Sequence, residues 1–508
     1  MNTKSRTYNV LFNAVANIGG QILTLVFSFL TRIVFIHAFG ESYLGINGLF
    51  TNILSVLSLA ELGVSSTIVY CMYKPIVDKD YHRLTALMNY YKKLYRVIGT
   101  VVAVIGLILV PFLDKLVNLD VDIGNVTFYY LLYLLNTVSS YFLVYKTAIL
   151  TADQKSYIIK ICRVAITAVQ FVVLAIVALV LKNFYAYLSL QIGFSILHNV
   201  ICSRIAQKQY PFIADKAELE KSEKNKIWSN IFSMFSYQVG NVLLNNTDNI
   251  LISILVNTVA VGFYSNYSMI VLSVGTFLQL LFSSIQASVG NLAAEGNETK
   301  QYQIFNVIQF MSFWTTSFCV VCFMVLFQDA ITILYTDHYL LGYDIVTVCA
   351  INFYVQYILY PIYCYRSTVG LFRQTRWIML FTSVINIVLS IVFGKIWGLF
   401  GILLATSISR IVTNFWYEPI KLFHIYFKQN AVQYFLKQFG AAAITIVLVI
   451  PMVCISRCMD GMDLYLRFIT KIAMCIIIPN TVFFVLFRKT TEFRYLRQIV
   501  EKKLKLSR

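Results

Sequence analysis

The chain has 508 residues, of which 59% are hydrophobic and only 13% are charged, and its mean hydropathy is +0.72. A soluble domain of this length needs far more charged surface, so the composition excludes the soluble class and indicates a polytopic membrane protein. The formal net charge is +18, and the position of the basic residues decides whether it reflects nucleic-acid binding or membrane topology.

Apolar segments of about 20 residues suffice to span a bilayer, and the sequence predicts about 14 of them. They cover residues 9–36, 44–71, 95–113, 126–150, 157–181, 184–203, 228–256, 262–290, 304–327, 343–366, 377–397, 399–418, 436–456 and 464–487. The predicted fold is an all-α integral membrane protein with two pseudo-symmetric six-helix bundles and an added C-terminal helix pair.

The longest polar connection divides the chain into two parts. We predict an N-terminal six-helix bundle at 1–203, a cytoplasmic linker at 204–227, a C-terminal six-helix bundle at 228–418, an additional helix pair at 419–487 and a basic cytoplasmic tail at 488–508. The last two spans carry almost no polar face, so we expect them to lie at the periphery against lipid.

The basic residues follow the positive-inside rule when the N-terminus is placed in the cytoplasm. Those in or beside the outer connections are Lys115, Lys182, Lys395 and Arg457. The net charge therefore indicates topology, with both termini cytoplasmic, and we expect no nucleic-acid partner. The basic tail is expected to bind anionic lipid of the inner leaflet.

A polar stripe follows one face of the first predicted span at helical spacing. Its members are Asn13, Asn17, Gln21, Thr24, Ser28 and Arg32. Lipid cannot hydrogen-bond these groups, so the stripe must face protein or water. Such a stripe is typical of a membrane protein that encloses an aqueous cavity.

Three further spans carry comparable stripes. The second has Asn47, Thr51, Ser55, Ser58, Glu61 and Ser65; the seventh has Gln238, Asn241, Asn245 and Asp248; the eighth has Thr276, Gln279, Ser283 and Gln286. The stripes therefore open each predicted half of the chain.

A sequence echo accompanies these stripes. GESYLGINGLFTNILSVLS at 40–58 aligns with NTVAVGFYSNYSMIVLSVG at 257–275, which places Gly45 opposite Gly262. We interpret the echo as two parallel halves related by a pseudo-twofold axis along the membrane normal. The alternative is chance similarity between two glycine-containing loops.

Four charged residues lie deep in predicted spans, where a charge is costly and needs a reason. Arg32 either snorkels to the outer interface or binds an anion at the cavity mouth. Arg410 lies in mid-span, which favours a lumen cation suited to phosphate. Glu61 and Asp248 either bind a coupling cation, Na⁺ or H⁺, or hold two helices together through buried hydrogen bonds.

Basic residues near the inner ends of spans have two interpretations. Topology alone explains Lys146, Arg163 and Arg366. The alternative is that they receive a phosphate headgroup that enters from the cytoplasmic leaflet.

Signals for catalysis are weak. Asp120 and Asp122 form a DxD in a short outer loop, but no histidine or acidic residue of matching spacing accompanies them, so a solvated loop is expected. The five histidines are scattered, and there is no Walker A motif. We therefore predict a transporter and not an enzyme, with no catalytic residues, no metal site and no cofactor beyond a coupling ion.

Two segments resemble the signatures of a known family. FGESYLGINGLFTNILSVLSLAELGVSSTIVY at 39–70 resembles the opening signature of polysaccharide repeat-unit flippases, with a short glycine-containing loop and a Glu61-Leu62-Gly63 ending. LLNNTDNILISILVNTVAVGFYSNY at 243–267 resembles the second signature, with Asp248 and the turn at 262–264. Over almost its whole length the chain is similar to Wzx-type flippases of the multidrug/oligosaccharidyl-lipid/polysaccharide (MOP) exporter superfamily.

The resemblance implies a MATE-like fold whose cavity is bounded by the first, second, seventh and eighth spans. It implies alternating-access transport of undecaprenyl-pyrophosphate-linked oligosaccharide repeat units across the cytoplasmic (plasma) membrane of a bacterium, for cell-surface polysaccharide synthesis. The expected partners are this lipid-linked oligosaccharide and the polysaccharide polymerase machinery. The expected substrate-binding residues are Arg32, Arg410, Asn17, Gln21, Ser58, Asn241, Asn245 and Gln279, and the candidate ion-coupling residues are Glu61 and Asp248.

Two alternatives stay open, because two deep acidic residues accompany the two deep basic ones. The first is a MATE-like ion-coupled exporter of organic cations. The second is a membrane glycosyltransferase or polymerase, which the DxD motif would serve.

Overall fold

The computed structural model describes residues 4–61, 63–119, 121–295, 298–375 and 377–506. Side chains are described throughout these ranges except at 4–17, 60, 66, 214, 230, 233–234, 236–237, 283–288, 290–295, 298, 372–373, 499–500 and 502–506. Every regular element in the described ranges is helical, as the sequence predicts, and the chain forms two compact units, Met1–Gly262 and Phe263–Arg508.

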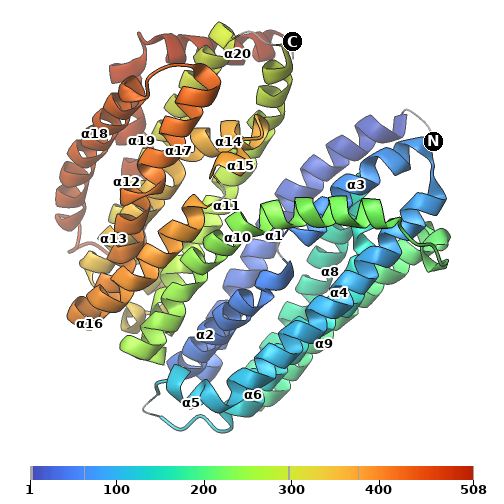
Figure 1. The fold of residues 1–508 in the computed structure, drawn as a ribbon. Helices are drawn as coiled ribbons and strands as arrows, with labels where there is room; N and C mark the ends of the chain where they lie inside the picture. Colours follow the sequence, from blue (N-terminus) through green and yellow to red (C-terminus); the bar gives the residue numbers. More distant parts are fainter. Residues whose placement is uncertain (1–3, 62, 120, 296–297, 376, 507–508) are drawn as a thin grey trace. The chain divides into compact units, whose positions relative to one another are not determined.

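The first unit is built from long helices joined by short turns (Figure 1). Its main elements are α1 (Lys4–Phe39), α2 (Glu41–Leu57), η1 (Ser58–Glu61), α3 (Val64–Asp78), α4 (Tyr81–Leu109), α6 (Val126–Val144), α7 (Ala148–Ala152), α8 (Ser156–Ile176), α9 (Phe184–Gln209) and α10 (Lys221–Leu255). Shorter pieces are η2 (Val110–Phe112), α5 (Leu113–Leu116), η3 (Tyr145–Thr147), η4 (Val177–Leu181) and η5 (Pro211–Ala214).

The second unit holds the remaining helices. They are α11 (Thr258–Glu295), which starts at the end of the first unit, then α12 (Glu298–Tyr335), η6 (Asp337–Tyr339), α13 (Tyr343–Ile358), α14 (Tyr360–Thr368), α15 (Phe372–Thr375), α16 (Ile378–Val412), α17 (Asn414–Leu422), η7 (Phe423–Phe427), α18 (Val432–Arg457), α19 (Leu464–Phe487) and α20 (Thr491–Leu506).

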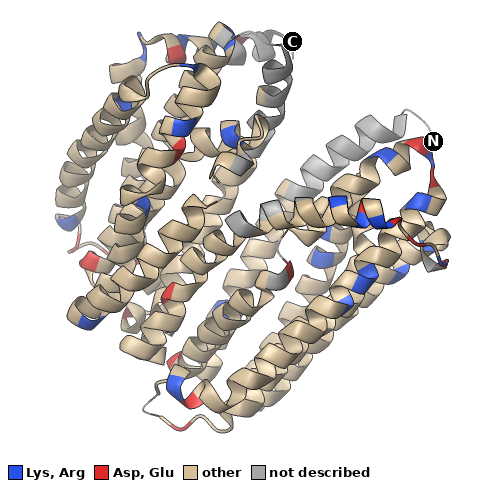
Figure 2. Cartoon of the chain, viewed as in Figure 1, with Lys and Arg blue, Asp and Glu red and all other residues tan. Residues whose placement is uncertain are grey.

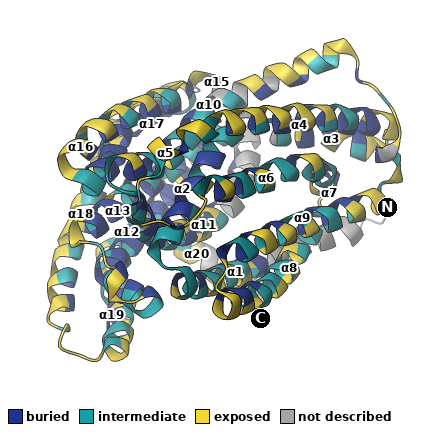
Figure 3. Ribbon diagram, turned by 90° about the horizontal axis from the view of Figure 1, so that it is seen from below, coloured by how far each residue is buried: buried dark blue, intermediate teal, exposed yellow. Residues whose placement is uncertain are grey.

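Ten segments of the described chain are long and apolar enough to cross a membrane. They are Ile18–Phe39, Tyr81–Leu116, Ser156–Leu181, Phe184–Gln209, Thr258–Phe282, Thr299–Tyr335, Tyr343–Thr368, Ile378–Phe427, Val432–Arg457 and Leu464–Phe487. Figure 2 shows that charged residues are sparse along these helices, and Figure 3 shows long exposed faces on α16 and α18. Those faces carry apolar side chains such as Val388 and Val447, as expected for helices in lipid, and the chain is a multi-pass membrane protein.

The ten segments and the predicted count of about 14 differ for identifiable reasons. The predicted spans 44–71 and 126–150 are each broken into shorter helices, and 228–256 coincides with the polar helix α10. The predicted spans 377–397 and 399–418 fall together in Ile378–Phe427, with a non-helical Gly398 (φ 57°, ψ −134°) between them. The larger count remains a prediction.

The division between the two units lies after Gly262, whereas the predicted linker is at 204–227. The reason is that α10 packs against α2 and α3 of the first unit. The sequence-based domain boundaries therefore remain a prediction about membrane topology. The boundary between the compact units is set instead by which helices pack together.

The two glycines that align in the sequence echo touch each other in the first unit. A Cβ added at Gly45 would lie 2.1 Å from the Thr258 carbonyl oxygen, and one added at Gly262 would lie 2.9 Å from the Gly45 backbone nitrogen. Only glycine permits this approach of backbone to backbone. The turn into α2 and the start of α11 are therefore in direct contact.

The C-terminal helix pair is held by polar contacts that the sequence analysis did not anticipate. The Ser317 and Thr445 hydroxyls are 2.7 Å apart, and the Trp314 indole donates to the Asn480 side chain at 2.7 Å. Lys471, 3% exposed, pairs with Asp329 of α12 at 2.9 Å. The few polar residues of α18 and α19 therefore contact α12, and the expected position of the pair at the periphery against lipid stays a prediction.

Candidate binding cavity

A polar cavity of about 890 Å³ lies wholly within the first unit. It is lined by α2, η1, α3, α6, α7 and α9, through Asn47, Thr51, Leu54, Ser55, Ser58, Glu61, Gly63, Ser65, Val69, Tyr73, Tyr133, Asn136, Thr137, Thr151 and Gln191. A volume of this size is at the upper end of the range of small-molecule sites. It can hold a ligand of several hundred daltons.

One wall of the cavity is the polar stripe of the second predicted span. All six of its members line the space: Asn47, Thr51, Ser55, Ser58, Glu61 and Ser65. The Thr51 hydroxyl donates to the Asn47 carbonyl at 2.6 Å, and the Ser55 hydroxyl donates to the Thr51 carbonyl at 2.8 Å. Because each hydroxyl proton is used within the helix, its oxygen lone pairs are left as acceptors for a ligand.

A second part of the lining comes from α6 and was missed by the sequence analysis. The Tyr133 hydroxyl donates to the Asn47 side-chain oxygen at 2.5 Å and so fixes the orientation of that amide. The Asn136 side-chain oxygen has no hydrogen-bond partner in the described part of the chain. Tyr133, Asn136 and Thr137 recur at helical spacing, which is the signal that would have identified this wall.

Glu61 is the charged group of the cavity. It ends the 3₁₀ segment η1, just before Gly63 adopts a left-handed conformation (φ 82°) and α3 begins. The Tyr95 hydroxyl of α4 donates to Glu61 Oε1. Among the described lining residues none is Lys, Arg or His, so the cavity offers amides, hydroxyls and a single carboxylate. This set suits a hydroxyl-rich neutral group or a cation better than an anion.

The first predicted span places its stripe differently. The Thr24 and Ser28 hydroxyls donate to carbonyls one turn back, at 2.6 and 2.8 Å. Gln21 Oε1 accepts from Lys160 of α8 at 2.7 Å, and Arg32 lies within electrostatic reach of Tyr187 of α9. The Asn17 side chain lies outside the described residues. None of these described side chains lines the cavity.

The candidate residues of α10 also lie apart from the cavity. The Asn245 amide donates to the Asn241 backbone carbonyl at 2.7 Å and to its side-chain oxygen at 3.0 Å. Asp248 is 8% exposed. Asn241, Asn245 and Asp248 belong to the first unit. Of all the candidate site residues predicted from the sequence, only Ser58 and Glu61 line the cavity.

The remaining candidates belong to the second unit. Gln279 is exposed on α11, and Arg410 of α16 is 6% exposed, with its Nη1 donating to Gln356 Oε1 at 2.7 Å. Arg410 is therefore buried and bonded to a neutral amide, and its role as a lumen cation for phosphate stays a prediction.

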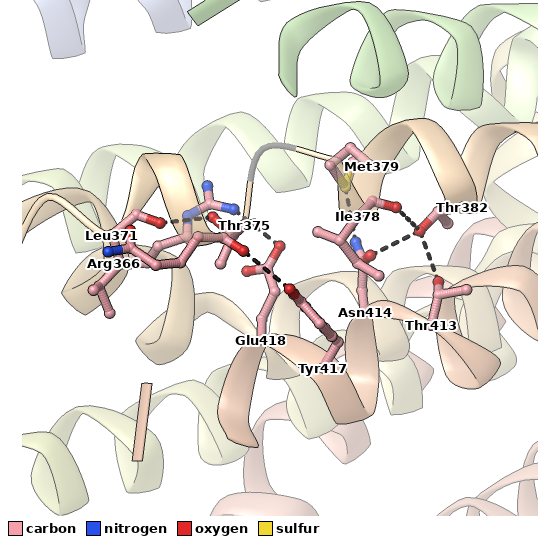
Figure 4. A network of polar contacts seen from close by, with 11 residues as sticks. Arg366, Leu371, Thr375, Ile378, Met379, Thr382, Thr413, Asn414, Tyr417 and Glu418 are labelled. Carbon is pink, nitrogen blue, oxygen red and sulfur yellow. Dashed lines mark hydrogen bonds and ion pairs between the residues drawn. The ribbon is translucent and has the colours of Figure 1, made fainter. Parts of the chain in front are cut away.

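Polar contacts in the same unit link side chains of α14, α16 and α17 (Figure 4). Arg366 Nη1 and Glu418 Oε1 form a buried ion pair at 2.9 Å, and Thr382 donates to the Asn414 side chain at 2.8 Å. Arg366 thus has a carboxylate partner that ties α14 to α17. The contact accounts for Arg366 structurally, because a buried charge needs such a partner.

The DxD residues Asp120 and Asp122 were considered as a possible metal site of an enzyme. Asp120 lies outside the described residues, and Asp122 Oδ1 accepts from the Gly124 backbone N–H at 2.8 Å within its own loop. In the described ranges no group of three or more His, Cys, Asp or Glu residues is arranged to hold a metal ion.

Comparison with known proteins rests on structure alone, because neither a protein-family model nor a curated protein sequence matches the chain. Lipid II flippase MurJ in an inward closed conformation aligns with a TM-score of 0.67 and 16% identity, covering 94% of this chain and 99% of that one. An inward-facing multidrug resistance MATE transporter of the MOP superfamily aligns with a TM-score of 0.63 and 13% identity, covering 79% and 97%.

A MOP superfamily transporter from Pyrococcus furiosus, described as having a binding pocket of reversed polarity, aligns with a TM-score of 0.53 and 14% identity over 83% of this chain and 96% of that one. The TM-scores of these alignments show a shared fold, and identities of 13–16% carry no information on specificity. The chain has the fold of the MurJ flippase and of MATE transporters, that of the MOP superfamily.

Proposed function

We propose that the chain is a transporter that flips undecaprenyl-pyrophosphate-linked oligosaccharide repeat units across the cytoplasmic membrane of a bacterium by alternating access, for cell-surface polysaccharide synthesis. The observation that supports this most is the cavity of about 890 Å³, whose described walls carry amides and hydroxyls from six helical elements. Sugars present hydroxyls at many positions, and such walls supply acceptors and donors to match them.

The proposal divides the substrate among the candidate residues. Ser58 and its neighbours in the cavity would bind the sugars, and Asn17, Gln21, Asn241 and Asn245 of the first unit and Gln279 of the second are further candidate contacts. Arg32 in the first unit and Arg410 in the second are each candidate ligands for the pyrophosphate, because the described walls of the cavity carry no basic side chain. Glu61 or Asp248 would couple transport to Na⁺ or H⁺, since a carboxylate in a hydrated site can bind either.

The direct test uses purified protein in liposomes. We expect it to move a labelled lipid-linked oligosaccharide from one leaflet to the other, measured as the fraction that becomes accessible to an added enzyme. Protein-free liposomes and liposomes with an unrelated polytopic protein are the controls. Movement no faster than in these controls would refute the proposal.

The anion-binding roles have a separate test in cells that need the glycan. We expect Arg32→Ala and Arg410→Ala to lower surface glycan, with the double variant the lowest, at unchanged protein levels in the membrane. Wild-type glycan in all three variants would rule out these roles and leave the liposome result standing.

A second candidate is an ion-coupled exporter of organic cations. It is favoured by Glu61, a carboxylate in a cavity whose described lining includes no basic residue. The same liposomes discriminate: Glu61-dependent uptake of a fluorescent organic cation without movement of the lipid-linked sugar would replace the first proposal by the second.

A further inference from the structure

Two basic residues lie inside the membrane segment Ser156–Leu181, one turn apart on α8. Lys160 and Arg163 are four and seven residues from the start of the helix, or about 6 and 10 Å along its axis. If α8 starts at the membrane surface, as the distribution of Lys and Arg predicts, that depth is the boundary between lipid headgroups and acyl chains. Basic side chains at this depth can reach the phosphates of the headgroups.

The position of Lys160 is fixed by α1. Its Nζ donates to Gln21 Oε1 at 2.7 Å, and its stem crosses Gly20, where an added Cβ would lie 2.9 Å from Lys160 Cγ. The partner of the ammonium is thus a neutral amide. Arg163, one turn further, is exposed and interacts electrostatically with His198 of α9.

The surrounding helices supply no carboxylate. α8 packs mainly against α1 and α9 and also contacts α7, and none of the four contains an Asp or Glu in its sequence. Their basic residues are Lys4, Arg6, Arg32, Lys160, Arg163, Arg204 and Lys208. Lys155, just before α8, differs from Lys160 in having a carboxylate partner, since its Nζ lies 2.8 Å from Asp153 Oδ2.

We propose that Lys160 and Arg163 bind the phosphate of a membrane lipid, with Gln21 holding the Lys160 ammonium in place. An ammonium and a guanidinium at headgroup depth match a phosphate or pyrophosphate, which takes a point charge and a bidentate fork together. The lipid is either the pyrophosphate-linked substrate, an assignment that rests on the proposed function, or an anionic phospholipid of the bilayer.

This site complements the cavity, whose described walls carry no basic side chain. With the orientation expected from the distribution of Lys and Arg, α8 starts at the inner leaflet, where both lipids are found. The phosphate would therefore be held at the membrane boundary of the first unit, outside the space that suits sugars.

The test is lipid binding to purified protein in detergent. The probes are a short-chain polyprenyl pyrophosphate, phosphatidylglycerol and, as a neutral control, the corresponding polyprenol. We expect Lys160→Gln/Arg163→Gln to bind a phosphorylated probe about tenfold more weakly, since two charge-assisted contacts are lost. Polyprenol binding should be unchanged.

Matched variants keep the result interpretable. Lys93→Gln removes an exposed charge from α4, and we expect no change in any probe. Lys160→Arg keeps the charge and should retain most of the binding. Should the double variant fail to fold, Arg163→Gln alone removes an exposed side chain and should still weaken binding severalfold.

The outcomes separate the sources of the phosphate. Loss for polyprenyl pyrophosphate alone assigns the site to the substrate, and loss for both lipids supports a shared phosphate site. In a third outcome, the wild type binds phosphatidylglycerol but not polyprenyl pyrophosphate, and the double variant loses phosphatidylglycerol binding. This result supports the phosphate site and counts against the proposed substrate. Unchanged binding of both phosphorylated probes, or an equal loss for polyprenol, overturns the proposal.

Discussion

Asp329 holds two basic side chains of α19 at once. Its Oδ1 lies 2.8 Å from Arg467 Nη2 and its Oδ2 lies 2.9 Å from Lys471 Nζ. Asp329→Asn leaves both cations with only the exposed Asp460 carboxylate, which is 3.8 Å from Arg467 Nη1 and 3.7 Å from Lys471 Nζ. We therefore expect a loss of about 3 kcal/mol in unfolding free energy, and a smaller loss for Lys471→Met. Thermal unfolding of the purified protein measures the order.

The control for this prediction is a pair near the C-terminus. The Arg497 and Glu501 side chains are 71% and 50% exposed, so Arg497→Ala should cost less than about 1 kcal/mol. A transition temperature of Asp329→Asn equal to that of Arg497→Ala would contradict the role given to the carboxylate.

Tyr133 orients an amide in the cavity wall through its hydroxyl. We expect Tyr133→Phe to slow transport of the lipid-linked sugar severalfold, because the Asn47 amide is freed, while stability falls by only about 1 kcal/mol. Tyr130 of the same helix is the matched control, since its hydroxyl donates to the Gly106 carbonyl at 3.0 Å and does not line the cavity. Equal transport losses in both variants would mean that folding, and not the site, is affected.

At the scale of elements, the contact between Gly45 and the start of α11 makes the sharpest prediction. The neighbour of an added Cβ at Gly45 is a backbone oxygen at 2.1 Å, which cannot rotate away. We expect Gly45→Ala to lower the yield of monodisperse protein and its transition temperature. Gly193→Ala on α9 has nothing within 4 Å and should be neutral or slightly stabilising, so a similar loss there would remove the packing explanation.

The elements also show what the sequence can and cannot reveal. The stripe of the second span was predictable because six polar residues at helical spacing in an apolar segment must share a helix face that points away from lipid. The break in the helix after Leu57 was not predictable, because the apolar pattern of the sequence continues into η1. In the structure the break is followed by the left-handed conformation of Gly63. Lys160 was missed because a basic residue near an inner span end already has a topological explanation.

Ion pairs between distant helices were beyond sequence reasoning altogether. Arg366 and Glu418 are 52 residues apart, and neither sequence segment contains a pattern that predicts their pairing. Periodicity identifies which face of a helix is polar. The partner of that face depends on packing, which is why the Gln21–Lys160 contact and the α6 wall of the cavity emerge only from the structure.

At the scale of the whole molecule, the distribution of basic residues predicts an even number of crossings with both termini in the cytoplasm. We expect a fluorescent protein fused after Arg508 to fluoresce and an alkaline phosphatase fused there to be inactive. A phosphatase fused within 337–344 should be active, because that outer connection has no basic residue. An active phosphatase at the C-terminus would contradict the predicted cytoplasmic terminus. If the fusion within 337–344 were also inactive, the topology would be inverted and the α8 pair would lie in the other leaflet.

The chemistry of the cavity walls has a consequence for how this protein diverges from its relatives. A chamber of amides and hydroxyls distinguishes ligands by the pattern of their hydroxyl groups and is indifferent to the lipid that carries them. Under the proposed function, lineages that change their surface sugar would need to alter only these few wall positions, and the proposed phosphate site at Lys160 and Arg163 would stay as it is.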